Sequence, residues 1–522
     1  MIIHKPSQKV LLNLSEPDRV TTVIPTAKTF MYKGTRLVAV PHKHDETRVL
    51  RNLGFEVPSP IEHYYDWPGQ YKPFEAQRVT AGFMTSNPKS FVFNDMGTGK
   101  TMSTLWAFDY LRSMGQAKSM LVVSPLSTLE RAWADEVFRH FPDLTVQVLY
   151  GSKARRLKLL KQPADIYLIN HDGIKTIEAE LISRRDIDTV AIDEIASFRN
   201  ASTSRWKSLS KICAGRERLW GLTGTPTPNL PTDAWAQCRL ISPERVPKYF
   251  GNFRDATMKQ LGPFKWLPRE SSSTTVADAM QPSIRFARAD CVDLPPCVYQ
   301  DREVKLTASQ GKAYKEMLTS LYFEVEQGQV TAINEAVKLS KLLQICCGGA
   351  YDKTGESIVL DAGPRIQETI DIIEQADGKA LVFVPFTSAL NTVTDALKEH
   401  FKGQSIMDDV VASVSGATPK NERDDIFHRF QKGDLKIIVA NPGTLSHGLT
   451  LTASNTIIWF GPPFSSEQYQ QANARISRPG QELTQFIVHI ESTEIERRVY
   501  ARLRSKQALQ GLLLGIIHEE RG

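Results

Sequence analysis

A glycine-rich turn between an apolar run and a segment of helical spacing constrains this chain more than any other feature. The turn covers residues 94–101 and reads Asn-Asp-Met-Gly-Thr-Gly-Lys-Thr, directly after the apolar residues 91–93. An order of strand, turn and helix is the context that a phosphate-binding loop requires. The sequence therefore predicts a nucleoside triphosphate site carried by an α/β sheet.

Each residue type in this turn has a chemical reason to be there. Glycines let backbone N–H groups close around a polyphosphate, Lys100 would reach the β and γ phosphates, and the Thr101 hydroxyl would hold Mg²⁺. Asn94 stands where the general pattern has its first glycine. The nucleotide contacts predicted in the loop are Met96, Gly97, Thr98, Gly99, Lys100 and Thr101.

Composition narrows the class of protein. The chain has 522 residues with 41% hydrophobic and 23% charged residues, which suits two or three globular domains. No apolar run reaches the roughly 18 residues of a membrane span, and the first residues lack a signal-peptide core. Six cysteines form neither a disulfide framework nor a zinc spacing, so we expect core packing and a cytoplasmic protein. A net charge of +6 permits nucleic-acid binding without requiring it.

Residues 1–62 are predicted to form a small α+β accessory module. Short strands are expected over 20–25, 29–32 and 36–40, followed by a helix over 44–53. Residues 1–60 hold nine Lys or Arg against five Asp or Glu. This excess of positive charge fits a DNA-contacting appendage, and a cap over the domain that follows fits equally well.

An aromatic residue and an amide stand about twenty residues before the phosphate loop. Phe74 and Gln77 would sandwich and hydrogen-bond an adenine base, although an ordinary helix start gives the same pattern. Their position relative to the loop favours the nucleotide role.

Residues 68–240 are predicted to form a first lobe with a parallel sheet covered on both faces, because buried strands alternate with helices. In such sheets ligands gather at the carboxyl ends of strands, where Ser124, Asn170 and His171 would lie. The strand over 189–192 runs into Asp193 and Glu194. Asp193 would anchor Mg²⁺ and Glu194 would be the general base for the attacking water, unless the pair lies on a surface loop.

A second alternating region covers residues 361–492, after helical insertions and an interlobe connection over 241–360 that includes a loop at 271–275. A C-terminal helical tail is predicted for residues 493–522. Arg475 and Arg478 are three residues apart, so a helix would place them on one face and point both at one phosphate cluster. We expect them to act as arginine fingers and Gln471 to contact nucleotide; a solvated basic face is the alternative.

Taken in order, these motifs resemble the Swi/Snf-type branch of superfamily-two helicases, and the compact chain is similar to short members in tailed bacteriophages. The resemblance covers about residues 68–505. It implies two RecA-like lobes, ATP and Mg²⁺ as cofactors, a DNA-dependent ATPase, and Gly448 as a further nucleotide contact. The motifs that carry it are the loop at 94–101, Asp193-Glu194, the Thr-Gly-Thr-Pro of 223–226, and the Gln-x-x-x-Arg-x-x-Arg-x-Gly-Gln of 471–481.

The resemblance also implies where nucleic acid binds and where this chain departs from its relatives. The family usually has histidine at the position of Ala196, where it is expected to link the nucleotide site to the nucleic-acid side. The implied DNA contacts are Ser124, Asn170, Thr223, Ser415, Gly416, Thr444 and Ser446.

We therefore expect a monomeric motor in a bacterial or phage-infected cytoplasm that hydrolyses ATP while tracking on duplex or branched DNA. Replication or recombination proteins are the partners this activity would serve. A strand-separating or strand-annealing helicase and a nucleotide-gated DNA-binding scaffold are the alternatives, and the residues alone leave RNA open as a track.

Overall fold

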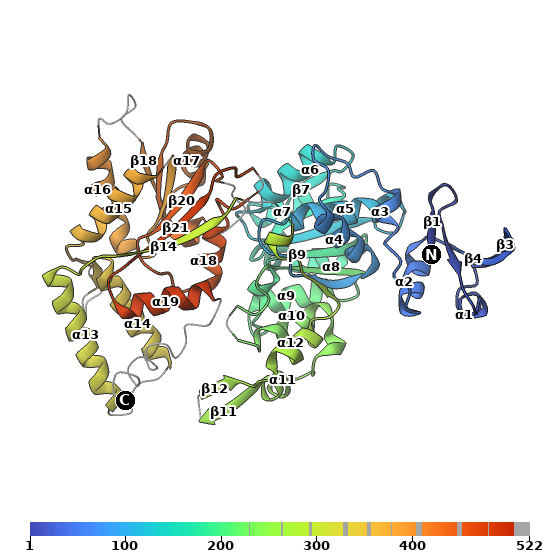
Figure 1. Cartoon of the computed structure of the whole chain (residues 1–522), viewed down its shortest axis with the longest axis horizontal. Helices are drawn as coiled ribbons and strands as arrows, with labels where there is room; N and C mark the ends of the chain where they lie inside the picture. The colour runs from blue at the N-terminus through green and yellow to red at the C-terminus, as the bar shows by residue number, and fades with distance from the viewer. Residues whose placement is uncertain are drawn as a thin grey trace. The chain divides into compact units, whose positions relative to one another are not determined.

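The computed structural model divides the chain into two compact units, Met1–Val292 and Asp293–Gly522 (Figure 1). The structure describes residues 1–228, 230–262, 265–291, 295–326, 332–351, 357–376, 378–402, 410–445, 451–478 and 480–505. Within these ranges no helix is both long enough and apolar enough to cross a membrane.

The N-terminal module is a four-stranded antiparallel sheet with short helices on one face. The strands are β1 (Ile2–His4), β2 (Lys9–Asn13), β3 (Lys28–Tyr32) and β4 (Thr35–Pro41), in the order β1-β2-β4-β3. Val10, Leu12, Val38 and Val40 point from the strands into its core. The helices are α1 (Asp18–Thr21) and α2 (His44–Asn52).

One strand prediction for this module is wrong. The stretch 20–25 is not a strand, because α1 begins after Pro17 and turns Val20 into the core. Two strands that we did not predict, β1 and β2, take the places in the sheet instead. The helix predicted over 44–53 is confirmed by α2.

The larger sheet of the first unit has seven strands in the order β13-β5-β10-β9-β6-β8-β7, and every neighbouring pair is parallel. The strands are β5 (Lys89–Val92), β6 (Ser119–Ser124), β7 (Val146–Val148), β8 (Ile166–Asn170), β9 (Ile187–Asp193), β10 (Arg218–Leu222) and β13 (Ser283–Ile284). The helices around it are α3 (Ile61–Tyr64), α4 (Glu75–Ser86), α5 (Lys100–Ser113), α6 (Asp135–His140), α7 (Lys153–Leu160), α8 (Glu178–Ser183), α9 (Ser204–Cys213) and α10 (Asp233–Ile241).

Helices cover both faces of this sheet, as the buried strands predicted. Along β6, Leu121 and Val123 point into one hydrophobic core, whereas Met120 and Val122 point into the other. Side chains alternate between the faces of a strand, so a strand whose residues are all buried must have a covering layer on each side. The predicted parallel α/β architecture is confirmed here.

The segment 241–360 contains helices, as predicted, including the long α13 (Ala308–Glu326) and α14 (Ala332–Cys346), and its first part also contains strands that we did not predict. The elements of this first part are α11 (Phe250–Thr257), β11 (Met258–Gly262), β12 (Lys265–Pro268), α12 (Ser272–Ala279) and β14 (Cys297–Glu303). The loop predicted at 271–275 is wrong, since α12 starts at Ser272 and packs Val276 and Ala279 against the core. The segment also supplies edge strands, because β13 pairs with β5 and β14 pairs with β21.

The second unit is built on six parallel strands in the order β14-β21-β20-β17-β19-β18. Its strands are β17 (Lys379–Phe383), β18 (Val411–Val414), β19 (Ile437–Ala440), β20 (Ser454–Trp459) and β21 (Gln485–Glu491), with a small pair β15 (Gly349–Tyr351) and β16 (Ser357–Val359). Its helices are α13 (Ala308–Glu326), α14 (Ala332–Cys346), α15 (Gly363–Gln375), α16 (Thr387–Phe401), α17 (Lys420–Lys432), α18 (Ser466–Asn473) and α19 (Glu494–Arg504).

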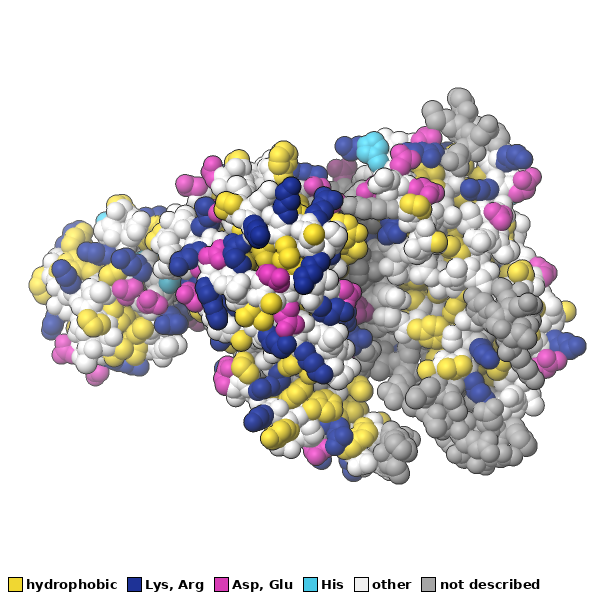
Figure 2. Space-filling view, turned by 180° about the vertical axis from the view of Figure 1, so that it is seen from behind, with side chains coloured by type: hydrophobic (Ala, Val, Ile, Leu, Met, Phe, Trp, Pro, Cys, Tyr) yellow, Lys and Arg dark blue, Asp and Glu magenta, His cyan; other side chains and the backbone are white. Residues whose placement is uncertain are grey.

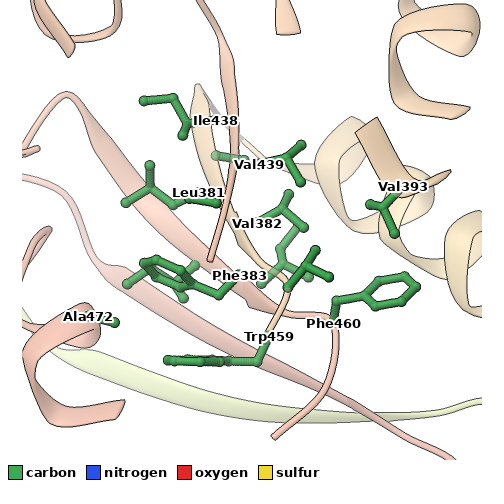
Figure 3. Close-up of a cluster of buried hydrophobic side chains, with 14 of the residues drawn as sticks. Leu381, Val382, Phe383, Val393, Ile438, Val439, Trp459, Phe460 and Ala472 are labelled. Carbon is green, nitrogen blue, oxygen red and sulfur yellow. The ribbon is translucent and has the colours of Figure 1, made fainter. Parts of the chain in front are cut away.

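The core of this unit lies on the central strands. Phe383 and Trp459 have ring centroids 4.8 Å apart, and Tyr469 of α18 lies 5.1 Å from the same tryptophan. Figure 3 shows this core with Leu381, Val382, Phe383, Val393, Ile438, Val439, Trp459, Phe460 and Ala472. The predicted fold, two parallel-sheet lobes with helices and a β-rich N-terminal module, is confirmed.

Candidate nucleotide-hydrolysis site

Five adjacent strands of the first lobe end at one edge of the sheet and carry the predicted polar residues there. The phosphate loop follows β5, Thr223 follows β10, Asp193 ends β9, Ser124 ends β6, and Asn170 ends β8. Because all these strands are parallel, their carboxyl ends meet at the same edge. Hydrogen bonds between the strand ends, described below, hold several of these residues together.

The phosphate loop has the backbone that its sequence predicts. Gly97 and Gly99 have φ angles of +82° and +77°, a left-handed conformation that glycine adopts without strain, and α5 begins at Lys100. A Cβ atom on Gly99 would collide with the side-chain amide of Gln77. The positive φ angle favours glycine here, and Gln77 lies against the loop. Whether Gln77 contacts nucleotide stays a prediction.

Gln77 is positioned from within its own helix. Its Oε1 accepts a hydrogen bond from the backbone N–H of Phe74 at 3.2 Å, which closes the first turn of α4. Gln77 is buried, whereas Phe74 is half-buried directly before the helix. Gln77 therefore closes the first turn of α4, as in an ordinary helix start, and also contacts the phosphate loop.

Asn94 explains why the loop departs from the general pattern. Its side-chain amide donates to Thr80 Oγ1 of α4 at 2.8 Å and its Oδ1 accepts from the backbone N–H of Phe286 at 3.0 Å. Lys100 Nζ donates to the backbone oxygens of Asn94, at 2.8 Å, and Asp95, at 3.2 Å. A glycine at position 94 would lose the side-chain bonds that tie the loop to α4 and to the segment after β13.

Two hydrogen-bond donors hold the carboxylate of Asp193 at the sheet edge. Trp133 Nε1 donates to its carboxylate at 3.0 Å and the Ser124 hydroxyl donates to the same oxygen at 3.3 Å. Burial raises the pKa of Asp193, while these hydrogen bonds and the charge of Lys100 act in the opposite direction. The carboxylate of Asp193 and the hydroxyl of Thr101 are the hard oxygen donors that suit Mg²⁺.

Glu194 has an unusual backbone conformation. Its φ angle of +51° is left-handed, which costs a non-glycine residue about 1–3 kcal/mol. Its Oε2 accepts a hydrogen bond of 3.1 Å from the Thr223 hydroxyl at the end of β10. A carboxylate oriented from the neighbouring strand is the arrangement that a general base needs.

Two predicted DNA contacts do not fit the side-chain positions. Ser124 and Thr223 are fully buried, and their hydroxyls bond to Asp193 and Glu194 respectively. Their side chains face the carboxylates instead of the surface, so we correct the expectation that these side chains bind DNA. Asn170 is half-buried, and its Oδ1 accepts two hydrogen bonds of 3.1 Å from Arg156.

Three of the predicted DNA contacts in the second lobe lie on neighbouring strand ends. Ser415 and the exposed Gly416 follow β18, and Thr444 follows β19. The Thr444 hydroxyl donates to the backbone oxygens of Asn441 at 2.7 Å and Val414 at 3.4 Å, which ties the two turns together. Ser446, the fourth predicted DNA contact of this lobe, and Gly448, a predicted nucleotide contact, lie outside the described residues.

The helical argument for the two arginines is wrong. Helix α18 ends at Asn473, so Arg475 and Arg478 lie in the turn that follows and share no helix face. Arg475 is buried, with its Nε donating to the backbone oxygen of Gln471 at 2.9 Å. Gln471 is also buried, and its amide donates to Glu467 at 3.1 Å. Whether these residues contact nucleotide stays a prediction.

His171 makes a contact that sequence reasoning missed. Its Nε2 lies 2.9 Å from the backbone oxygen of Asp193, and its ring meets the Phe198 ring edge-on at 4.9 Å. The residue is buried and follows β8 directly. The available signal was its position at a strand end, but only the sheet order shows that it reaches the carboxylate motif.

Comparisons with known proteins show which families this chain resembles. Residues 65–349 match the SNF2-related domain and residues 364–480 match the helicase conserved C-terminal domain. A protein named p41 from Acyrthosiphon pisum secondary endosymbiont phage 1 is 27% identical over 85% of this chain and 98% of its own length. The Bacillus subtilis protein YwqA, described by its name as a candidate ATP-dependent helicase/translocase, is 24% identical over 81% of this chain.

The chain spans less than half of the longer bacterial relative, since the match covers 46% of YwqA. Among solved structures, the SWI2/SNF2 ATPase core of Sulfolobus solfataricus, in complex with dsDNA, matches 84% of this chain and 92% of that chain. This match has 22% sequence identity and a TM-score of 0.42. Because the two matched domains cover most of the chain, the chain belongs to the SNF2-related family, the Swi/Snf-type branch of superfamily-two helicase ATPases.

Proposed function

We propose that this SNF2-family motor hydrolyses ATP while tracking on duplex DNA, and that it remodels forks, branched DNA or bound proteins. The observation that carries the proposal is the pair of oriented carboxylates at the sheet edge that also bears the phosphate loop. Thr223 bonds to Glu194, and Trp133 and Ser124 bond to Asp193. A surface pair of acidic residues would have no such buried donors.

The proposed roles at this site are the following. Lys100 and the N–H groups at the start of α5 bind the β and γ phosphates, and Gln77 and Phe74 bind the base. Glu194 orients and deprotonates the attacking water. Thr101 and Asp193 would hold Mg²⁺, which when bound neutralises charge on the phosphates. Arg475 and Arg478 are proposed as the arginine fingers.

DNA binding by this motor should be independent of sequence. Gly416 is exposed at the carboxyl edge of the second sheet, with Ser415 and Thr444 half-buried beside it. Small and hydroxyl-bearing residues contact phosphates through backbone N–H and O–H groups, and phosphate contacts carry no base information. We therefore expect affinity to fall steeply with salt and to vary little with base composition.

The test is ATP turnover without nucleic acid and then with single-stranded, duplex or forked DNA, each at two salt concentrations. The Lys100→Ala variant is the background control, because it removes the phosphate contact and leaves the DNA surfaces intact. Strong stimulation by plain duplex that falls with salt supports the proposal. Stimulation by forks alone would favour the strand-separating or annealing hypothesis, and no stimulation by any DNA would overturn the duplex motor.

A further inference from the structure

The N-terminal sheet has one face that its own core does not cover. Residues that point into the module, such as Val10 and Val38, occupy the other face together with Thr29 and Met31. Since side chains alternate along a strand, the register places a second set on the opposite, outer face. That set includes Ile2, Lys9, Leu11, Lys28, Phe30 and Tyr32.

Two aromatic rings stand exposed on this outer face. Phe30 is 37% exposed and Tyr32 is 56% exposed, both on β3, which is the edge strand of the sheet. All five residues of β3 are exposed. Exposed apolar side chains on an edge strand promote aggregation, so such a surface commonly marks a binding site. Figure 2 shows hydrophobic and Lys or Arg side chains next to one another on this module, at the left of the view.

The strand layer of this module carries only positive charge. Residues 1–13 and 28–41 contain Lys5, Lys9, Lys28, Lys33 and Arg36 and neither Asp nor Glu. All five acidic residues among the first 60 fall in the segments 14–27 and 42–60, which include α1 and α2. The overall excess of four positive charges is therefore concentrated on the sheet.

The spacing of the rings selects the form of ligand. Phe30 and Tyr32 are two residues apart on one face, which separates them by about 7 Å along the strand. A strand within a duplex advances only about 3.4 Å per nucleotide, so two rings at this spacing suit bases that are already unstacked. Lys33 Nζ lies 5.6 Å from the centre of the Tyr32 ring, which places a cation beside one of the rings.

We propose that the outer face of the N-terminal sheet binds single-stranded nucleic acid, stacking unpaired bases on Phe30 and Tyr32 while Lys9 and Lys28 contact the phosphates. Aromatic platforms flanked by basic residues bind single strands with little sequence preference, because every base has a π-face. Binding at this face does not depend on the proposed motor activity. Its use in the motor does, since it would direct the enzyme to junctions that carry a single strand.

Addition of a protein strand to β3 is the competing use of this edge. Strand addition uses the backbone groups in the plane of the sheet. It gives no reason for two rings and two lysines to share the outer face. The uniform positive charge also favours a polyanion over an average protein surface.

The experiment measures binding of the full chain to fluorescein-labelled dT20 and to a 20-base-pair duplex, without nucleotide, by anisotropy. Phe30→Ala with Tyr32→Ala should weaken dT20 binding about tenfold or more, because two bases lose the aromatic rings on which they stack. The same double variant should change duplex binding less than twofold. The matched control is Met31→Ala, which removes a 65% exposed side chain of the same strand from the opposite face. Met31→Ala should leave both affinities unchanged.

Two further measurements, the salt dependence of dT20 binding and the rate of ATP turnover, separate base stacking from charge and from the motor activity. Lys9→Glu with Lys28→Glu should flatten the dependence of log affinity for dT20 on log salt, by about 0.7 for each phosphate that the protein no longer neutralises. Basal and duplex-stimulated ATP turnover should be unchanged in the Phe30 and Tyr32 double variant. Unchanged dT20 affinity in that variant, or an equal decrease in Met31→Ala, would overturn the proposal, even if the duplex motor is confirmed. If duplex DNA does not stimulate ATP turnover but the double variant shows the expected decrease in dT20 affinity, the motor proposal fails and the single-strand proposal is supported.

Discussion

Replacing Thr223 by valine tests whether the sheet edge works as a hydrolysis site. Thr223 is fully buried and its hydroxyl donates to Glu194 at 3.1 Å, so Thr223→Val keeps the shape and removes the donor. A hydrogen bond to a charged group is worth about 1.5–3 kcal/mol. If the bond serves to orient the base, its removal lowers ATP turnover about 10- to 100-fold, at 1.4 kcal/mol per factor of ten.

The same turn supplies a matched control. The Thr225 hydroxyl is buried and has no hydrogen-bond partner among the residues that the structure describes, so Thr225→Val exchanges this hydroxyl for a methyl group. We expect Thr225→Val to keep wild-type turnover, with unchanged or slightly higher stability. Thr223→Ser restores a hydroxyl and should recover most of the turnover that Thr223→Val removes. Thr223→Val also leaves the N–H of Thr225 without its 3.2 Å acceptor, so thermal unfolding is measured for all three variants.

The assay distinguishes the two roles that Thr223 has been given. Turnover is measured without DNA and with saturating duplex, and duplex affinity is measured separately across a salt series. Lower turnover in both conditions with unchanged duplex affinity supports a residue that positions Glu194. Turnover within twofold of wild type together with weaker duplex binding would refute this reasoning and restore the DNA contact that the sequence suggested.

Four further predictions address other parts of the chain. Glu194→Gln should bind ATP but hydrolyse it about 10²- to 10⁴-fold more slowly; undiminished hydrolysis would place the base elsewhere. Arg475→Ala or Arg478→Ala should lower turnover about 10³-fold, and near-normal rates in both would end the finger assignment. Asn94→Gly leaves a backbone N–H without its acceptor, a destabilisation of about 2 kcal/mol, so that amide should exchange hydrogen about 30-fold faster, with Thr80→Val as the milder control. Burial lowers the pKa of His489 to about 4, below its ordinary 6.5, so between these pH values the unfolded chain binds a proton that the folded chain does not. The free energy of unfolding of the second lobe should therefore fall by about 3 kcal/mol from pH 6.5 to 4. An equally steep fall with pH in His489→Gln would contradict this.

Sequence reasoning predicted that the candidate residues share one sheet edge because the relevant rule is topological. Parallel strands end at one edge, so Asp193 at the end of β9 and Glu194 directly after it had to lie on the same edge as the loop after β5 once the sheet was parallel. It did not show which way a hydroxyl at a strand end turns. Ser124 and Thr223 were expected at the DNA surface, and both turn toward the carboxylates instead. The direction of the hydroxyl depends on the residues of neighbouring strands, which a local sequence pattern does not predict.

Edge strands and helix ends were missed for related reasons. β13 has two residues, and its pairing with β5 joins positions about 190 residues apart, so it has no periodicity to detect. At α18 the sequence reads as helix through Arg478, yet the helix ends at Asn473. A following segment with Pro479 and Gly480 indicates a stop, but not at which residue the last turn unwinds.

The departures from the family pattern are explained by what surrounds them. Asn94 takes the place of a glycine because its side chain joins the loop to α4 and to Phe286. Ala196 takes the place of a histidine that would link the nucleotide site to the nucleic-acid side, and it is fully buried. Here an imidazole reaches the same motif from another strand, since His171 contacts the backbone of Asp193. His171 adjoins Asn170, a predicted DNA contact at the end of β8.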